Sequence, residues 1–227
     1  MKEVKIKPIA YIKTDFPSKF GIPRQSGLTN LKAYITFEPE YRDANALTGI
    51  ENFTHLWLIW HFSLSDNKGG WSPTVRPPRL GGNKRMGVFA TRSPYRPNPI
   101  GLSCVRLDKV EHTANGPVLT VFGADLVDGT PIFDIKPYIP FADCHTDASQ
   151  GYTEDTKEYK ISVEISDDLL SSFPKEKRDA LLEILSEDPR PAYQDDPERI
   201  YGFSFAGYEI RFTVRENLLT VTDIIKM

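Results

Sequence analysis

The chain has 227 residues, of which 40% are hydrophobic and 26% charged, enough for one large domain or two modest ones. It lacks the run of about 18 apolar residues that a membrane-spanning helix needs, and its first residues lack the continuous apolar core of a signal peptide. The two cysteines, Cys104 and Cys144, do not indicate a disulfide framework, so we expect a protein of the reducing cytoplasm.

The net charge of −3 is unevenly distributed along the chain. Residues 67–107 contain no Asp or Glu but eight Lys and Arg residues, so the remainder carries −11. This segregation predicts a local docking surface for a polyanion. The alternative is a basic loop that pairs with acidic loops elsewhere in the fold. The eight residues are Lys68, Arg76, Arg79, Lys84, Arg85, Arg92, Arg96 and Arg106.

Apolar alternation predicts strands over Val4–Lys13 and Leu31–Phe37, joined by a loop rich in proline and glycine. A short helix is predicted over Glu40–Leu47, closed by Gly49. Aromatic and branched residues in Phe53–Phe62 predict a strand buried on both faces. Residues 63–85 are predicted to form a long loop. Loops of this length are usually either functional or disordered, and Trp71, Val75 and Leu80 favour an ordered one.

Three further strands are predicted over Gly101–Glu111, Val118–Leu126 and Thr130–Tyr138. The turn Val127-Asp128-Gly129 has the residues that a tight hairpin between the last two strands needs. About six strands without long intervening helices predict an antiparallel sheet that closes into a barrel.

Residues 87–102, GVFATRSPYRPNPIGL, contain an apolar run at Val88–Ala90, then three prolines before a strand that begins at Ile100. Proline fixes φ and removes a donor, so this segment is predicted to be a stiff loop between two strands. It presents Arg92, Arg96 and Asn98, which suit a planar anionic ligand. The alternative is a surface loop whose arginines face water.

After a polar linker at 143–157, a second region begins near Ile161. A helix is predicted from Pro174 to Leu185 or Ser186, with Leu181, Leu182 and Leu185 inward. Strands are predicted over Ile200–Phe205, Tyr208–Arg215 and Leu218–Ile225. We therefore expect a mainly β, α+β protein: a six-stranded antiparallel β-barrel over residues 1–160 and a small C-terminal α+β domain over residues 161–227.

Several common chemical motifs are absent. The sequence has no GxGxxG after a strand, no GxxxxGK[ST], no CxxC and no HExxH. His55 and His61, with Cys144 and His145, could form part of a metal site, but buried hydrogen-bonded histidines are the favoured interpretation and no metal is expected. Ser103 and Cys104 lack a neighbouring residue that would activate a nucleophile.

The chain resembles the TsaA-like family, and within it the TrmO-type tRNA methyltransferases. The matching segments are PRQSGL (23–28), FTHLWLIW (53–60), GGWSPTVRPPRLGG (69–82), GVFATRSPYRPNPIGL (87–102), DLVDGTPIFDIKPYIPFAD (125–143) and DPRPAYQ (188–194). The resemblance implies a six-stranded barrel with a smaller C-terminal domain, a homodimer, and S-adenosylmethionine as cofactor without a Rossmann fold. It also implies N6-methylation of N6-threonylcarbamoyladenosine at position 37 of tRNA.

The resemblance implies a cofactor site on several loops. Arg92 would hold the methionine carboxylate, and Asp128 either accepts the ribose hydroxyls or simply forms a good turn. Related sequences often have His-Gln where this chain has Ser63-Leu64. The expected cofactor residues are Ser26, Gly27, Leu28, Ser63, Leu64, Arg92, Leu102, Asp125, Leu126, Val127, Asp128, Gly129 and Thr130.

The substrate would be held by a second set of residues. Arg96 or Arg190 could clamp the threonine carboxylate of the modified base, and Tyr95 and Tyr193 could stack on bases or simply pack. Arg76, Arg79, Lys84 and Arg85 would contact phosphates of the anticodon stem. No catalytic base is indicated. Two alternatives remain: a non-catalytic barrel that binds RNA or senses S-adenosylmethionine, and a methyltransferase for a small molecule.

Overall fold

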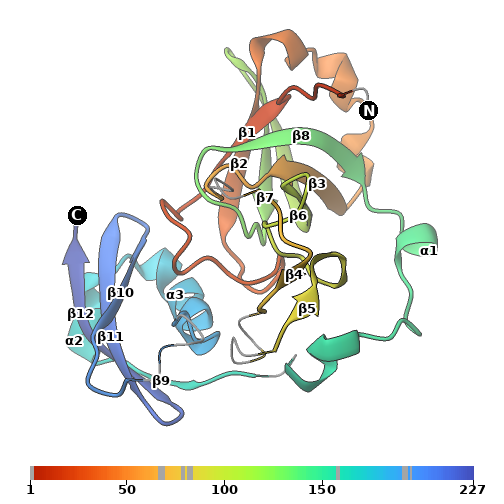
Figure 1. Cartoon of the computed structure of the whole chain (residues 1–227). Helices are drawn as coiled ribbons and strands as arrows, with labels where there is room; N and C mark the ends of the chain where they lie inside the picture. The colour runs from red at the N-terminus through yellow and green to blue at the C-terminus, as the bar shows by residue number, and fades with distance from the viewer. Residues whose placement is uncertain are drawn as a thin grey trace.

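The computed structural model describes residues 3–65, 70–77, 80, 84–156, 159–190, 194 and 196–227. Figure 1 shows a β-barrel, with a second, smaller sheet and its helices to one side. Six antiparallel strands close the barrel in the order β1-β2-β7-β6-β3-β8, which confirms the predicted architecture. They are β1 (Ala10–Lys13), β2 (Lys32–Phe37), β3 (His55–His61), β6 (Ile100–Thr113), β7 (Gly116–Phe122) and β8 (Thr130–Pro137).

One face of each barrel strand fills the interior. On β3, Leu56, Leu58 and Trp60 are buried, while the residues between them are only half-buried. The prediction that this strand is buried on both faces is therefore wrong, because a barrel wall has an inner and an outer side. Its outer side is partly covered by aromatic neighbours such as Tyr138, whose ring centroid lies 5.7 Å from that of Trp57.

Two local predictions in the barrel differ from the structure, one in where a strand begins and one in the type of helix. The first strand begins at Ala10 rather than Val4, and Pro8, which has no amide donor, lies just before the paired residues. The predicted helix over Glu40–Leu47 is instead a series of short 3₁₀ turns. The Asp43 carboxylate accepts the Asn45 amide and starts a new turn there. These turns are η1 (Pro39–Tyr41), η2 (Ala44–Leu47) and η3 (Ile50–Asn52).

The predicted hairpin at Val127–Gly129 is wrong. Strand β7 ends at Phe122, and β8 pairs with β3 and β1 rather than with β7. The segment between them crosses one end of the barrel, where the amides of Asp128 and Gly129 donate to the carbonyls of Phe16 and Ile12 at 2.8 Å. Barrel closure thus determines the partners of this turn, whatever its local conformation.

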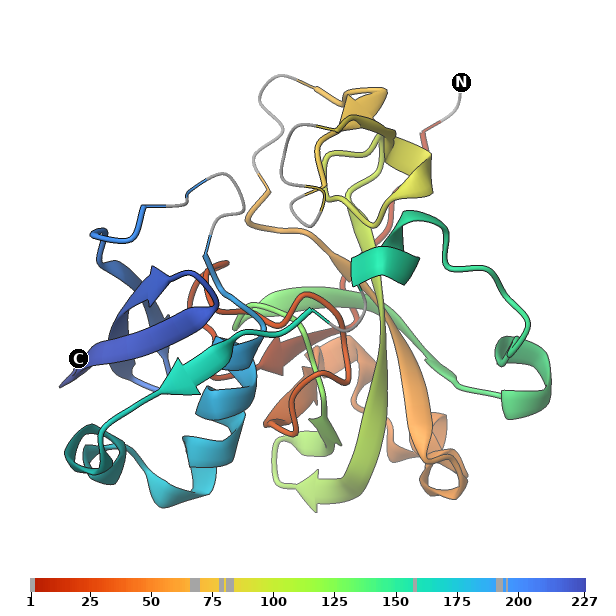
Figure 2. The ribbon, with the colours of Figure 1, turned by 90° about the horizontal axis from the view of Figure 1, so that it is seen from below.

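Two short strands of the basic segment, residues 67–107, form a small ribbon beside the barrel (Figure 2). It consists of β4 (Thr74–Val75) and β5 (Met86–Gly87), followed by the 3₁₀ turn η5 (Val88–Ala90) in place of the strand-like run expected there. Residues 91–99, with their three prolines, contain neither helix nor strand, as predicted. Val88 is buried and its amide donates to the Pro73 carbonyl at 3.0 Å, which extends the pairing of the two strands by one residue.

The C-terminal region contains a four-stranded sheet in the order β10-β11-β12-β9. Its predicted strands are confirmed as β10 (Tyr201–Phe205), β11 (Tyr208–Arg215) and β12 (Leu218–Lys226). The sequence did not predict β9 (Ser162–Glu164), parallel to β12, or α2 (Asp167–Ser172). The predicted helix is η7 (Lys175–Lys177) followed by α3 (Arg178–Ser186), which buries Ile184 in place of the half-buried Leu182.

Loop 14–31 joins the two regions. Phe16 belongs to the C-terminal core and stacks on Phe205 with ring centroids 5.4 Å apart, and Lys177 pairs with Asp15 at 2.5 Å. The return connection includes α1 (Pro140–Asp143) and η6 (Gly151–Thr156), and runs along the outside of the molecule (Figures 1 and 2). The domain boundary at residue 160 stays a prediction. No helix among the described residues is long and apolar enough to cross a membrane.

Candidate functional site

Arg92 meets the PRQSGL loop at one end of the barrel. Its exposed guanidinium donates from Nη1 to Oε1 of Gln25 at 2.6 Å, across 67 residues of sequence. The Arg92 loop is braced by Arg96, whose Nη1 donates to the carbonyl oxygens of Thr91 and Ser93 at 2.9 and 3.2 Å. The structure therefore uses the Arg96 guanidinium to shape this loop, and Arg92 is the arginine that it presents.

A directed hydrogen-bond chain lies beside this pair. The indole N–H of Trp60 can only donate, and it donates to Oγ of Ser103 at 3.0 Å. The Ser103 proton is then directed at Oδ1 of Asp125, 2.5 Å away. Burial raises the pKa of Asp125, although the bond from Ser103, the backbone of Ser26 and the charge of Arg92 oppose the rise. Asp125 therefore links β6, the PRQSGL loop and Arg92.

The glycines in the predicted cofactor loops leave backbone accessible. Gly27 has φ +82°, donates to the Gly123 carbonyl at 2.9 Å, and has no described atom within 4 Å of where a Cβ would lie. Gly129 has φ +76° and equally open space. A ligand can approach both backbones closely, and a side chain at either position would be strained. Next to Gly27, the Ser26 hydroxyl accepts the Cys104 amide at 3.2 Å.

The other predicted cofactor residues divide into exposed and buried groups. Leu28, Leu64 and Leu102 expose their side chains and offer apolar surface, and Ser63 is exposed beside Leu64. Leu126 and Thr130 bury theirs, and Val127 is half-buried, so Leu126 and Thr130 can offer a ligand only backbone atoms.

Asp128 has a structural role. Its Oδ1 accepts the Thr14 amide at 2.9 Å, which ties this turn to the end of β1.

Three of the eight predicted RNA-binding residues lie on the ribbon. Arg76, Lys84 and Arg85 are exposed there, and Arg85 donates to the Thr74 hydroxyl at 3.3 Å. Tyr95 is exposed on the adjoining loop. Arg79 and Tyr193 lie outside the described residues.

Arg190 is already engaged. It forms a two-pronged pair with Asp188, at 2.8 Å from Nε and 2.9 Å from Nη2, and Tyr159 donates to the same carboxylate at 3.0 Å. Burial would raise the pKa of Asp188, but the bonds and charge of Arg190 more than offset this and lower it. Breaking a buried pair is costly, which opposes the predicted use of Arg190 as a substrate clamp. The Asp188 carbonyl also accepts Nη2 of Arg24 at 2.7 Å.

Metal binding would require a group of histidines, cysteines and carboxylates, and thiol chemistry would require an activated cysteine. Over the described ranges, no group of three His, Cys, Asp or Glu side chains is placed to hold a metal ion. Both cysteines are free, and burial, followed by the charge of Asp143, raises the pKa of the Cys104 thiol. Cys104 therefore stays protonated near neutral pH and is a poor nucleophile.

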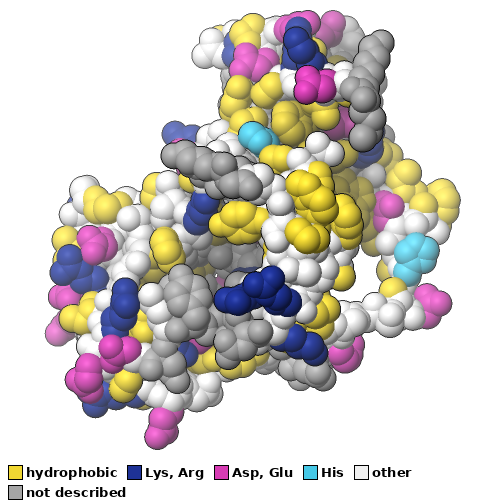
Figure 3. Space-filling model, viewed as in Figure 1, with side chains coloured by type: hydrophobic (Ala, Val, Ile, Leu, Met, Phe, Trp, Pro, Cys, Tyr) yellow, Lys and Arg dark blue, Asp and Glu magenta, His cyan; other side chains and the backbone are white. Residues whose placement is uncertain are grey.

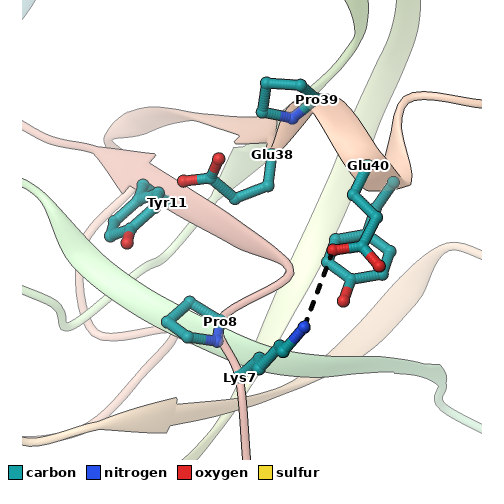
Figure 4. A pocket seen from close by; sticks show the side chains of 7 residues that line it. Lys7, Pro8, Tyr11, Glu38, Pro39 and Glu40 are labelled. Atoms are coloured by element: carbon teal, nitrogen blue, oxygen red, sulfur yellow. Dashed lines mark ion pairs between the residues drawn. The ribbon is translucent and has the colours of Figure 1, made fainter.

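A pocket elsewhere on the barrel is separate from the candidate site. It lies between the start of β1 and η1, where Lys7 and Glu40 form an exposed ion pair at 4.0 Å (Figure 4). None of the predicted cofactor or RNA residues lines it. The lining residues are Lys7, Pro8, Tyr11, Glu38, Pro39, Glu40 and Tyr41.

Sequence reasoning missed three residues of the site. Gln25 lies within the PRQSGL segment and carries no distinctive local signal. Trp60 was expected only as part of a buried strand, and Ser103 was judged by its neighbours in sequence, whereas its partner Asp125 lies 22 residues away. Ser103 also lacks the histidine that commonly activates a serine nucleophile, because the acceptor of its hydroxyl is the carboxylate of Asp125.

Residues 11–144 match the family model of the tRNA-methyltransferase O N-terminal domain, and residues 158–227 match the TrmO C-terminal domain. The tRNA (adenine(37)-N6)-methyltransferase of Escherichia coli is 40% identical over 225 residues, 95% of each chain. RcsF of Pseudomonas aeruginosa, whose name describes an S-adenosylmethionine-dependent methyltransferase, is 39% identical over 96% of each chain. A crystal structure of TrmO from the same species superposes with a TM-score of 0.76 at 32% identity, covering 98% of this chain and 99% of the other. This chain therefore belongs to the TrmO family.

Proposed function

We propose that this protein is an S-adenosylmethionine-dependent tRNA methyltransferase that methylates N6 of threonylcarbamoyladenosine at position 37, beside the anticodon. Family membership over both domains supports the activity. The contact of Arg92 with Gln25 is the observation on which the site rests, because it places a guanidinium on the loop that carries the Ser26 hydroxyl and the accessible backbone of Gly27. Since the substrate is tRNA, we place the protein in the cytoplasm.

The residues fit S-adenosylmethionine in both charge and shape. Arg92 would pair with the methionine carboxylate, the open backbones of Gly27 and Gly129 would approach the ligand, and the exposed leucines would cover its adenine. When bound, the cofactor supplies an electrophilic methyl group. The remaining task of the protein is to hold the acceptor nitrogen in line and to keep water away.

The test is methyl transfer with labelled S-adenosylmethionine to tRNA that carries or lacks the threonylcarbamoyl group. We expect label only in the modified tRNA, on one nucleoside identified by mass spectrometry, because the resemblance implies threonylcarbamoyladenosine and not plain adenosine as the acceptor. Tight binding of both RNAs without transfer would instead support a non-catalytic barrel. Efficient transfer to the free nucleoside would support a small-molecule methyltransferase.

We also propose that the protein is a homodimer, as in the family it resembles. In the segment after β8, residues 140–150 are exposed, and Phe141 in α1 is 92% exposed. The start of this segment is fixed, because Asp143 accepts the Trp57 indole at 3.1 Å and the Ile139 amide at 2.8 Å. A rigidly held, uncovered phenylalanine suits a contact with a second copy.

Sedimentation equilibrium tests the dimer. The wild type is expected to sediment with twice the mass of the chain, and Phe141→Glu to shift toward monomer. Ile200→Glu, which alters an exposed residue of the C-terminal region, is the matched control and should leave the mass unchanged. A wild-type mass equal to one chain would refute the dimer.

A further inference from the structure

Two large aromatic rings lie exposed together at the open end of the basic ribbon. Trp71 is 51% exposed and Phe89 is 73% exposed, and their rings stack with centroids 6.2 Å apart and planes 26° apart. Trp71 comes just before β4 and Phe89 just after β5, so the antiparallel pairing of Thr74 with Gly87 brings them to the same end. Val88, buried beside Phe89, fixes their position.

The surroundings of this pair are cationic. Arg76 and Arg85 are exposed on the same ribbon, Arg92 follows Phe89 by three residues, and residues 67–107 contain no acidic residue. Figure 3 shows hydrophobic side chains gathered over this part of the molecule, directly beside a group of Lys and Arg side chains. Exposed rings next to positive charge favour a ligand with both flat apolar faces and negative charge.

We infer that Trp71 and Phe89 form a stacking platform for an unpaired base of the RNA, next to the target nucleotide; this rests on the proposed function. Aromatic side chains that receive splayed bases are the usual means of recognising single-stranded RNA loops. The neighbouring basic residues would contact phosphates and so add affinity without selecting single strands. A second copy of this chain is a less suitable occupant, because it would bring the same positive charge to the contact.

The test measures binding of an anticodon stem-loop RNA and of a fully paired RNA of the same length, without cofactor. Trp71→Ala and Phe89→Ala are each expected to weaken stem-loop binding by about 5-fold to 100-fold, while the paired RNA is nearly unaffected. The slope of log affinity against log salt should stay constant, because no phosphate contact is lost. The conservative variants Trp71→Phe and Phe89→Tyr should restore most of the affinity.

Two control variants and a stability measurement distinguish the loss of base stacking from the loss of phosphate contacts and from unfolding. The double variant Lys84→Ala/Arg85→Ala should weaken both RNAs and reduce the salt slope by about 1–2. Tyr34→Ala removes an exposed aromatic residue of β2, outside the basic segment, and should change neither RNA. Unchanged thermal unfolding of each variant shows that the fold is kept.

Three outcomes would overturn the platform: equal losses for stem-loop and paired RNA, no loss in either alanine variant, or a loss of dimer mass that accounts for the weaker binding. Quenching of Trp71 fluorescence by the stem-loop gives a second readout, expected to disappear in Trp71→Phe. Since none of these measurements needs methyl transfer, an inactive protein would refute the proposed function and still leave the platform testable.

Discussion

Replacing Arg92 by alanine is expected to lower S-adenosylmethionine affinity by about 100-fold, through the loss of about 3 kcal/mol of charge-assisted hydrogen bonding. The physical reason is the exposed guanidinium, which Gln25 orients at 2.6 Å and Arg96 supports through the loop backbone. A preoriented guanidinium can bind a carboxylate through two parallel hydrogen bonds, with little further loss of side-chain freedom. Calorimetric titration of the purified protein measures the affinity directly.

A ligand without the amino-acid group makes this test specific. Methylthioadenosine keeps the adenosine and the sulfur but lacks the carboxylate, so wild type and Arg92→Ala should bind it equally. Arg215→Ala, which removes an exposed arginine of β11 paired with Glu198, is the matched control and should change neither affinity. Equal losses for both ligands would show that Arg92 only maintains the loop, and unchanged affinities would remove it from the site.

The barrel was predictable because its strands carry their own signal. Alternation along residues such as Ala33, Ile35 and Phe37 of β2 indicates one buried face, whatever the partner strand is. Which strands pair with one another was not predictable in the same way. Val127–Gly129 has good turn chemistry, yet the strands that flank it do not pair, because closure of the barrel brings β8 between β1 and β3. Local sequence cannot report that choice.

The site shows the same division between local and long-range information. The exposure of Arg92 on a stiff, cationic loop was predictable, but its contact with Gln25 spans 67 residues and that of Ser103 with Asp125 spans 22. Such contacts depend on the ends of separate strands, and no spacing encodes them. Arg190 is the opposite case: Asp188 lies only two residues away, so their pairing was a local possibility that competes with the predicted substrate role.

Among glycine-to-alanine substitutions in the barrel strands, Gly101→Ala should be the most destabilising. A Cβ at this position would lie 2.3 Å from Cε2 of Trp60, and that ring is held by Ser103 and by Phe62, whose centroid is 4.3 Å away. The ring must therefore shift, at a cost of about 3 kcal/mol, which corresponds to a fall in Tm of about 10 °C for a chain of this size. Thermal unfolding followed by circular dichroism gives the value.

The same substitution should also weaken cofactor binding, because displacement of Trp60 removes the donor that directs the Ser103 proton to Asp125. Gly87→Ala is the matched control: its φ of −58° is ordinary and no described atom lies within 4 Å of the new methyl group, so its stability should change by less than about 0.5 kcal/mol. In a Trp60→Leu background, Gly101→Ala should lose most of its effect, since the obstructing ring is gone. Equal effects in both backgrounds would mean that the methyl group clashes with something other than Trp60, and that the link from the barrel interior to Asp125 does not pass through this ring.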